Sequence, residues 1–245
     1  MQYQSEARIL AQTLQLPFLA HKTREYDLQL CYLENYIELF SSKLNSAIHI
    51  DFCAGKLAHR HQYGGGRGQA IARAIGLKQG RSPTVLDATA GLAADAFILA
   101  TLGCPLTMLE RSPILTTLIN DAIDRAQHEK SLGKVFQRGF CVHNIDALDY
   151  MQQLLEKNRP DVIYLDPMYP ERKKSARVKK AMQILQQLHG SDDNAETLLA
   201  TSLHKARKRV VVKRPVHAPA IANHKPSTSI KTKKTRFDIY VIEKL

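Results

Sequence analysis

The sequence between residues 69 and 242 alternates short apolar segments with segments of helical length, and this alternation limits the possible folds more than any other feature. Strands that alternate with helices predict βαβ units, and therefore a mainly parallel α/β sheet with helices on both faces. The segment 161–166 is apolar between two aspartates, as expected for a strand buried on both faces. Right-handed crossovers bring the carboxyl ends of such strands to one edge of the sheet, where we expect a ligand to bind.

The individual elements are predicted from the hydrophobic period and from turn and capping residues. We expect strands at 84–87, 106–110, 135–143, 161–166, 209–213 and 237–242, and helices at 69–77, 93–102, 113–130, 148–157, 176–188 and 195–205. The N-terminal region instead mixes short apolar segments with turn residues, which predicts a small strand-containing α/β appendage over residues 1–58. The main domain is then expected to span residues 59–245.

The positive charge is concentrated in the last third of the chain. Residues 1–165 hold 17 Lys and Arg against 16 Asp and Glu, whereas residues 166–245 hold 18 against 7. A local basic field favours a polyanionic partner such as nucleic acid. A lysine-rich solubilising surface is the alternative.

Several classes of protein are disfavoured by the remaining composition. No apolar run approaches the roughly 20 residues of a membrane helix, and the N-terminus lacks the basic flank and apolar stretch of a secretory signal. We therefore expect a cytoplasmic protein that does not bind a membrane. The four cysteines have no CxxC spacing and are expected to be buried reduced thiols, and the histidines show no metal-binding spacing, so no metal site is expected.

The first predicted main strand ends in an acid that is followed by small residues, Asp87-Ala88-Thr89-Ala90-Gly91-Leu92-Ala93-Ala94-Asp95. Such a turn into a helix lets backbone N–H groups approach a ligand closely. The segment lacks the GxGxxG spacing of a dinucleotide-binding turn, which argues against a nicotinamide oxidoreductase.

The next two strands also end in polar residues. Glu110-Arg111 lies 19 residues after Gly91, and an acid at this distance can accept the hydroxyl hydrogens of a ribose. Asn144-Ile145-Asp146 follows the third strand, where a polar side chain could meet an adenine edge or Asp146 could cap the next helix.

The fourth segment, Asp166-Pro167-Met168-Tyr169-Pro170, is the most specific. Two prolines restrict the backbone, and an acid and an aromatic ring three residues apart could hold a planar base by its edge and its face. This Asp-Pro-x-Tyr pattern is similar to the signature of amino-group methyltransferases that use S-adenosylmethionine.

The chain as a whole resembles the ribosomal RNA small-subunit methyltransferase J family, bacterial enzymes that methylate the exocyclic N2 of a guanine. The resemblance covers roughly residues 50–245, and the first 50 residues match poorly. One departure is that the family commonly has Gly-Arg where this chain has Ala93-Ala94 before Asp95, so any contact made by that arginine is lost. The motifs that carry the resemblance are His59-Arg60, Tyr63 to Gly68, Asp87 to Leu92, Met108 to Arg111, Tyr164 to Pro170, Lys173 to Ala176, Val211 to Pro215 and Arg236 to Tyr240.

The resemblance implies a Rossmann-like class I methyltransferase sheet and S-adenosylmethionine as cofactor. It places the methionine end of the cofactor over the 87–95 turn, the ribose on Glu110 and the adenine near residues 143–146. The implied cofactor-binding residues are Asp87, Ala88, Gly91, Ala94, Asp95, Glu110, Arg111, His143, Asn144, Asp146 and Asp166.

The resemblance also implies the catalytic residues. Asp166 and the Pro167 carbonyl would accept the amino hydrogens of guanine, and Tyr169 would stack on the base. The partner would be small-subunit (16S) ribosomal RNA or the assembled small subunit.

Basic residues near this region are expected to contact RNA phosphates, which positions RNA without reading its sequence. The glycine-rich segment 64–68 lacks the residues of an ATP-binding loop and is expected to be a lid or a surface turn. The candidate RNA-binding residues are Arg67, Arg172, Lys173, Lys174, Arg177, Lys213 and Arg214.

Two other functions remain open on sequence alone. A DNA amino-group methyltransferase would share the Asp-Pro-x-Tyr pattern. A non-catalytic RNA-binding or ribosome-assembly factor could retain the fold, although the presence of Asp87, Glu110 and Asp166 argues against it.

Overall fold

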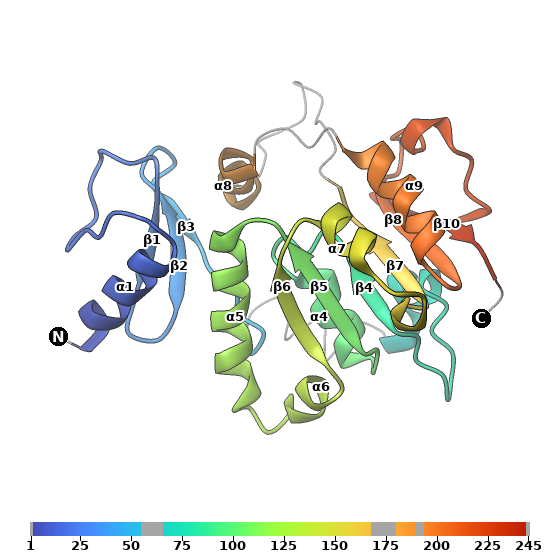
Figure 1. Ribbon diagram of the computed structural model, residues 1–245, viewed down its shortest axis with the longest axis horizontal. Coiled ribbons are helices and arrows are strands. Elements are labelled where there is room, and N and C mark those ends of the chain that lie inside the picture. The colour runs from blue at the N-terminus through green and yellow to red at the C-terminus, as the bar shows by residue number, and fades with distance from the viewer. Residues whose placement is uncertain (1, 55–65, 168–179, 190–193, 244–245) are drawn as a thin grey trace.

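The computed structural model describes residues 2–54, 66–167, 180–189 and 194–243 (Figure 1). Its main body is a seven-stranded sheet with strand order β6-β5-β4-β7-β8-β10-β9. The five strands from β6 to β8 are parallel, and β10 pairs antiparallel with both β8 and β9. The sheet is formed by β4 (Val85–Asp87), β5 (Leu106–Glu110), β6 (Phe140–Asn144), β7 (Val162–Leu165), β8 (Arg209–Pro215), β9 (Thr228–Lys231) and β10 (Thr235–Val241).

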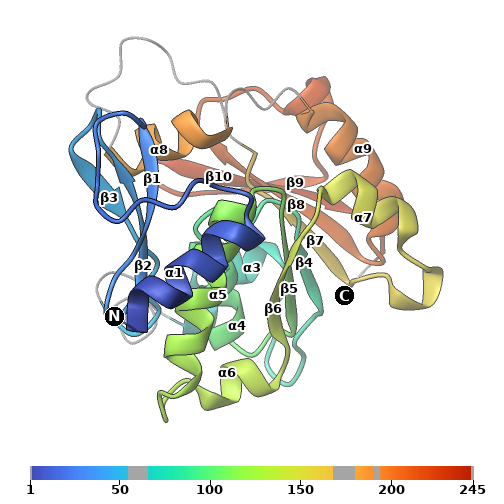
Figure 2. The same cartoon turned by 60° about the vertical axis from the view of Figure 1, so that its left-hand side comes forward.

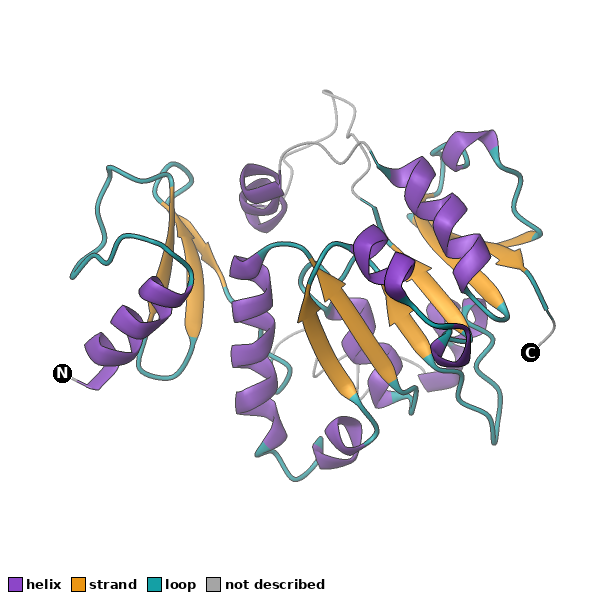
Figure 3. Ribbon diagram, viewed as in Figure 1, coloured by secondary structure: helices purple, strands orange, loops and turns teal. Residues whose placement is uncertain are grey.

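Helices cover both faces of this sheet (Figure 3), which confirms the expected α/β class. Alternate residues of one strand enter two separate apolar cores: Val211 of β8 belongs to one, and Val210 and Val212 to the other. The first core includes α3 (Ala70–Ala74), α4 (Ala94–Thr101), α5 (Pro113–Gln127) and part of α8 (Lys180–His189), and the second includes α7 (Ala147–Gln153), α9 (Ala195–Lys205) and η3 (Ile221–Asn223). A strand buried on both sides needs apolar residues at every position, and all four residues of β7 are buried.

The main sheet differs from the expectation in two places. The segment 135–143 is not one strand, because α6 (Gly133–Gln137) occupies its first part and only the remainder joins β6. Gly139 separates the two with a φ of 90°, which glycine adopts without steric cost. Strand β9 was not predicted; it is short and largely exposed, so it lacks an apolar pattern.

The cysteines are also less buried than expected. All four are free thiols, but only Cys104 is buried, whereas Cys53 and Cys141 are exposed and Cys31 is half-buried. None of the helices in the described ranges is both long and apolar enough to span a bilayer.

The N-terminal region contains strands and a helix, as expected for an α/β appendage. Helix α1 (Gln2–Thr13) packs against β1 (Leu28–Tyr32), and β1 pairs antiparallel with β2 (Ile37–Ser41), which pairs with β3 (Ser46–Ile48). Strand β2 also packs against α5, so this small sheet lies beside the main body (Figure 2). The predicted boundary at residue 58 falls outside the described residues and stays a prediction.

An aromatic cluster fixes the end of the N-terminal region to the main core. Phe52 is 1% exposed, and its ring stacks on Phe97 of α4 with centroids 4.5 Å apart. It also meets the edge of Phe140 on β6 at 5.7 Å. The guanidinium of Arg125 donates to the carbonyl of Ile50 next to this cluster. These contacts join the two regions into one continuous core.

We expect Phe52→Ala to destabilise the whole protein by about 3–5 kcal/mol, because it removes a buried ring and leaves a cavity between the two regions. Urea unfolding should show a single transition at a lower midpoint. The exposed Leu155→Ala, with a side chain that is 59% accessible, should change stability by less than about 0.5 kcal/mol. Two separate transitions in the wild type would contradict a shared core.

Candidate functional site

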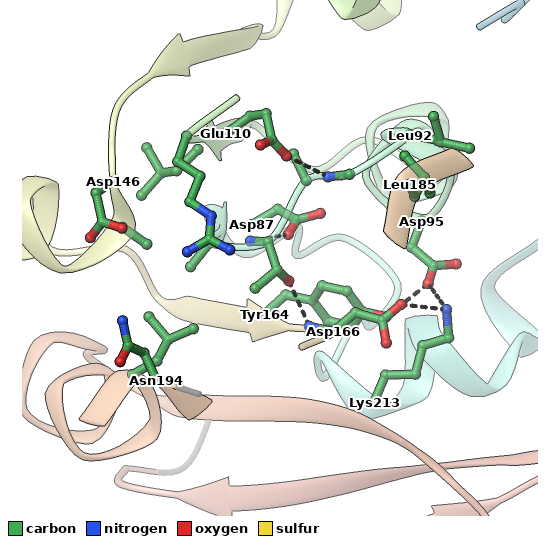
Figure 4. Close-up of a pocket in the computed structure, with 18 of the residues that line it drawn as sticks. Asp87, Leu92, Asp95, Glu110, Asp146, Tyr164, Asp166, Leu185, Asn194 and Lys213 are labelled. Carbon is green, nitrogen blue, oxygen red and sulfur yellow. Dashed lines mark hydrogen bonds and ion pairs between the residues drawn. The ribbon is translucent and has the colours of Figure 1, made fainter. Parts of the chain in front are cut away.

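A cavity of about 410 Å³ opens at the carboxyl ends of β4, β5 and β7 (Figure 4). This is the edge at which the sequence predicted a ligand, and the volume is within the range of small-molecule sites. The cavity is lined by Asp87, Ala88, Thr89, Ala90, Gly91, Leu92, Ala94, Asp95, Leu109, Glu110, Arg111, Ile145, Asp146, Ala147, Leu148, Tyr164, Asp166, Met182, Leu185, Asn194, Leu198 and Lys213.

The turn after β4 forms the floor of the cavity. The Asp87 carboxylate accepts the Thr89 N–H at 3.0 Å, which holds the start of the turn. Gly91 and Ala93 have φ values of 54° and 55°, and these left-handed residues reverse the chain directly into α4. The small side chains of this turn leave its backbone open to the cavity.

Glu110 ends β5 with a carboxylate whose orientation is fixed by the backbone. Its Oε2 accepts the Gly91 N–H at 3.1 Å, and its Oε1 accepts the Ser112 N–H at 2.8 Å. The side chain is buried but lines the cavity. An acid held in this way at the end of the strand beside β4 suits the hydroxyl groups of a ribose.

Asp166 follows β7 on the opposite side of the turn. Its backbone N–H donates to Thr89 Oγ1 at 2.6 Å, and its Oδ2 is 2.8 Å from Nζ of Lys213. Lys213 also contacts Asp95 Oδ2 at 2.7 Å, and the hydroxyl of Tyr164 donates to the same Asp95 oxygen at 2.8 Å. The network therefore joins β7, α4 and β8 at one point of the cavity wall.

The acids of this network repel one another in a partly water-excluded site. Burial raises the pKa of Asp87 to about 7, and the nearby Asp95 and Asp166 add to the shift. Burial also raises the pKa of Asp166, although Lys213 opposes that shift, and it raises the pKa of Tyr164 further beside Asp95. Five acids but only two bases are among the residues that line the cavity, so the site carries excess negative charge, which favours a ligand with a positive charge.

The same surroundings keep Lys213 in its charged form. Burial alone would lower its pKa, but Asp166 and Asp95 together raise it, so the ammonium group stays protonated. Among the described residues, no group of three or more His, Cys, Asp or Glu side chains is arranged to hold a metal ion.

Most residues expected to bind a cofactor meet in this cavity. His143 and Asn144 are not among the lining residues: the exposed His143 ring stacks on Tyr150 at 5.8 Å, and Asn144 Nδ2 donates to the Glu110 carbonyl at 2.9 Å. Asn144 therefore supports the loop after β5. The expected residues that do line the cavity are Asp87, Ala88, Gly91, Ala94, Asp95, Glu110, Arg111, Asp146 and Asp166.

The candidate RNA-binding residues are more dispersed. Lys213 points into the cavity, and Arg214 is 6% exposed, with its guanidinium donating to the Pro219 carbonyl. A buried guanidinium cannot meet a phosphate at the surface, so we leave Arg214 out of any RNA-binding surface. Arg67 is exposed and donates to the Lys78 carbonyl at 2.6 Å. Tyr169, Arg172, Lys173, Lys174 and Arg177 lie outside the described residues, whereas Pro167 is described and buried.

Sequence reasoning missed several residues of the cavity. Tyr164 belongs to a motif that was recognised, but its hydroxyl partner Asp95 is 69 positions away in the chain. Asn194, Met182 and Leu185 come from α8 and the start of α9, whose positions over the cavity no local pattern indicates.

Comparison with known proteins agrees with this geometry. A family model described as putative SAM-dependent methyltransferase matches residues 10–242. The chain is 47% identical over 242 residues to a ribosomal RNA small subunit methyltransferase J from Colwellia psychrerythraea (strain 34H), with 96% of this chain and 88% of the relative covered. It is 51% identical over 197 residues to the protein of that name from Tolumonas auensis, with 80% and 78% covered.

A solved structure shows the same fold. The crystal structure of a SAM-dependent methyltransferase from Neisseria gonorrhoeae is 32% identical, with a TM-score of 0.76 and with 96% of this chain and 91% of that chain covered. The family match begins at residue 10 and so includes most of the first 50 residues, whereas the alignment to the Tolumonas relative covers 80% of the chain.

We expect Asp87→Asn to become more stable relative to the wild type as the pH rises from about 4 to about 7. A folded-state pKa of about 7 against an ordinary value of 3.8 means that the wild type loses stability over this range, which the neutral amide avoids. The increase in the unfolding free energy of Asp87→Asn relative to the wild type should level off above pH 7, at no more than roughly 4 kcal/mol. Chemical denaturation at pH 5 and pH 8 measures it.

The matched control is Asp124→Asn, because Asp124 is exposed on α5. Its free energy of unfolding should follow the wild type at both pH values. If the unfolding free energies of Asp87→Asn and the wild type change equally between pH 5 and pH 8, the raised pKa of the buried Asp87 carboxylate is contradicted.

Proposed function

Because the chain belongs to the ribosomal RNA small subunit methyltransferase J family of S-adenosylmethionine-dependent methyltransferases, we propose that it methylates the exocyclic N2 of a guanine in 16S ribosomal RNA. The observation that carries the proposal is the meeting of Asp87, Glu110 and Asp166 in one cavity at the carboxyl edge of the sheet. The first two acids suit the methyl donor, and the third suits an amino group.

The residues present fit S-adenosylmethionine. The excess negative charge of the cavity suits the positively charged sulfonium and ammonium groups of this molecule, and the fixed Glu110 carboxylate suits its ribose. Apolar residues from α7 and α9, including Leu148 and Leu198, line the side of the cavity near Asp146 and would flank a planar adenine. When bound, the donor supplies a methyl group made electrophilic by the sulfonium, so the reaction needs no activation by a metal.

The role of Asp166 follows from the chemistry of the acceptor. The lone pair of guanine N2 is delocalised into the ring, so this nitrogen is a weak nucleophile until it is held in line with the methyl carbon. Asp166 would accept an amino hydrogen, and the Pro167 carbonyl would accept the other, which positions N2 and polarises it. Positioning of this kind lowers a barrier by several kcal/mol.

The transfer itself conserves atoms and charge. N2 forms a bond to the methyl carbon as the carbon–sulfur bond breaks, and one amino proton leaves N2. In this proposal Asp166 would receive this proton, and its raised pKa makes it a better base than an ordinary aspartate. Tyr169 would stack on the base after it leaves its own stack, a contact typically worth about 1–3 kcal/mol.

The basic last third of the chain supports a nucleic-acid substrate. Lys173, Lys174 and the neighbouring Arg172 and Arg177 follow the Asp166 segment directly in sequence, so RNA phosphates bound there would lie near the reacting base. Exposed Arg67, which lies within the glycine-rich segment 64–68, is a further candidate contact.

We expect the purified protein to transfer labelled methyl from S-adenosylmethionine to small ribosomal subunits that lack the modification. Digestion to nucleosides and mass spectrometry should identify N2-methylguanosine. Free 16S RNA and double-stranded DNA are tested in parallel. Label in DNA alone would favour a DNA amino-group methyltransferase, and cofactor binding with no transfer to any of them would favour a non-catalytic factor.

We expect Asp166→Ala to lower the rate of transfer by about 10²–10⁴-fold, because the acceptor loses both its positioning and its proton acceptor. Binding of S-adenosylmethionine, measured by calorimetry, should largely survive. Asp124→Ala is the matched control, since it removes an exposed aspartate on α5. Undiminished turnover in Asp166→Ala would end the assignment of this residue.

A further inference from the structure

Lys213 occupies a central position between the acids of the cavity. Its ammonium nitrogen is 2.7 Å from Asp95 Oδ2 and 2.8 Å from Asp166 Oδ2. Asp95 is in the first turn of α4, Asp166 follows β7 and Lys213 is on β8. One side chain therefore links the donor side of the cavity to the residue proposed to hold the acceptor.

Asp166 is restrained at two points, and within the described residues its Oδ1 makes no hydrogen bond. Its backbone N–H is held by Thr89 Oγ1, and its Oδ2 is held by Lys213. The side chain is nevertheless 40% exposed, so the carboxylate lies at the mouth of the cavity and not inside the core. A carboxylate anchored through one oxygen presents its other oxygen in a defined direction.

We propose that Lys213 is a positioning residue for methyl transfer, which anchors Asp166 through Oδ2 and leaves Oδ1 to accept a hydrogen of the acceptor amino group. This inference rests on the proposed function and adds a residue whose chemistry differs from phosphate binding, the role expected from its place in a basic segment. The transfer is the one described above, and Lys213 neither gains nor loses a proton in it.

Lys213 also affects the protonation of Asp166, together with the other charges around that carboxylate. Asp166 is faced by the acids Asp87 and Asp95, by Tyr164 and by the basic Arg214, besides Lys213 itself. Burial and Asp95 raise the pKa of Asp166, whereas Lys213 and Arg214 lower it. Without Lys213, Asp166 would hold its proton to a higher pH, and a protonated carboxyl group could not receive the proton that leaves N2.

The packing around Lys213 indicates that its carboxylate contacts hold it in place. Its side chain is 27% exposed, and it borders a second hollow of about 290 Å³ lined also by Gln69, Thr232, Thr235 and Phe237. The two carboxylates, more than close packing, thus fix the ammonium group. A neutral side chain of similar length should therefore fit without disturbing the core.

The test measures kcat between pH 5 and pH 9 for the wild type and for Lys213→Met, Lys213→Gln and Lys213→Arg, with saturating donor and small-subunit RNA. Both neutral variants are expected to lower kcat by about 10²-fold and to move the acidic limb of the profile to higher pH. Lys213→Arg retains the charge and should restore the limb and part of the rate. Binding of S-adenosylmethionine by calorimetry should change less than kcat in all three.

Lys22→Met is the matched control, because Lys22 pairs with Glu38 at the same 2.8 Å distance but lies in the N-terminal region. It should leave both kcat and the limb at wild-type values. Circular dichroism normalises each rate to the folded fraction. Lys213→Gln keeps hydrogen-bond donors for the two acids, so it is the neutral variant used for the test if Lys213→Met is unfolded.

The outcomes separate the two proposals. If the wild type transfers no methyl to RNA, the proposed function fails, whatever the variants do. If the wild type is active and the neutral variants keep its kcat, or lose rate with an unshifted acidic limb, the positioning role of Lys213 is overturned. The positioning role is supported if the acidic limb of the kcat profile moves to higher pH in the neutral variants and returns to its wild-type position in Lys213→Arg.

Discussion

The parallel pairing of β4 between β5 and β7 is the constraint on which the whole site depends. Asp87 lies opposite Met108 on one side and Tyr164 on the other. Glu110 and Asp166 come two residues after these partners, so each extends just beyond the end of β4. Because side chains alternate along a strand, a step of two residues keeps the same face, and both acids flank the turn that follows Asp87. A shift of one residue in either pairing would turn one acid away from the cavity.

The same pairing creates an electrostatic problem that the site solves with few groups. It brings Asp87, Asp95 and Asp166 together where water is partly excluded, and like charges in such a place disfavour ionisation. Backbone N–H groups, the Tyr164 hydroxyl and the Lys213 ammonium each stabilise one or two of the carboxylates. The compensation is incomplete, since burial and the neighbouring acids still raise the pKa of Asp87 to about 7. A cationic ligand would supply the missing positive charge, so an electrostatic cost in the free protein becomes a preference for S-adenosylmethionine.

Local signals in the sequence predicted the parts of this site that depend on a single strand and its turn. Apolar segments that end in an acid located β4, β5 and β7, and the carboxyl-edge rule brought their acids together. The sequence could not predict the Lys213 contact with Asp95, because it joins residues 118 positions apart and depends on how far β8 extends. Charge alone suggested a phosphate contact for both Lys213 and Arg214, yet neighbouring residues of a strand point to opposite faces: Lys213 lines the cavity, and Arg214 is buried against the Pro219 carbonyl. The prediction of a strand over 135–143 failed for a local reason, because Val135 and Phe136 are apolar in a short helix as they would be in a strand.

The alanine pair in the first turn shows how the site depends on its acids. Ala93 has φ 55° and ψ 18°, a left-handed conformation that costs a residue with a Cβ roughly 1–2 kcal/mol. Its methyl group is fully buried, which offsets part of that cost, so the turn keeps its shape without glycine. Ala94 lines the cavity at the position where the family that the chain resembles commonly has arginine. With a methyl group there instead, this position adds no positive charge to the cavity, and the link between Asp95 and Asp166 is made by Lys213. Asp95 and Asp166 therefore depend on the charge of Lys213, and on that of the donor itself, for electrostatic balance.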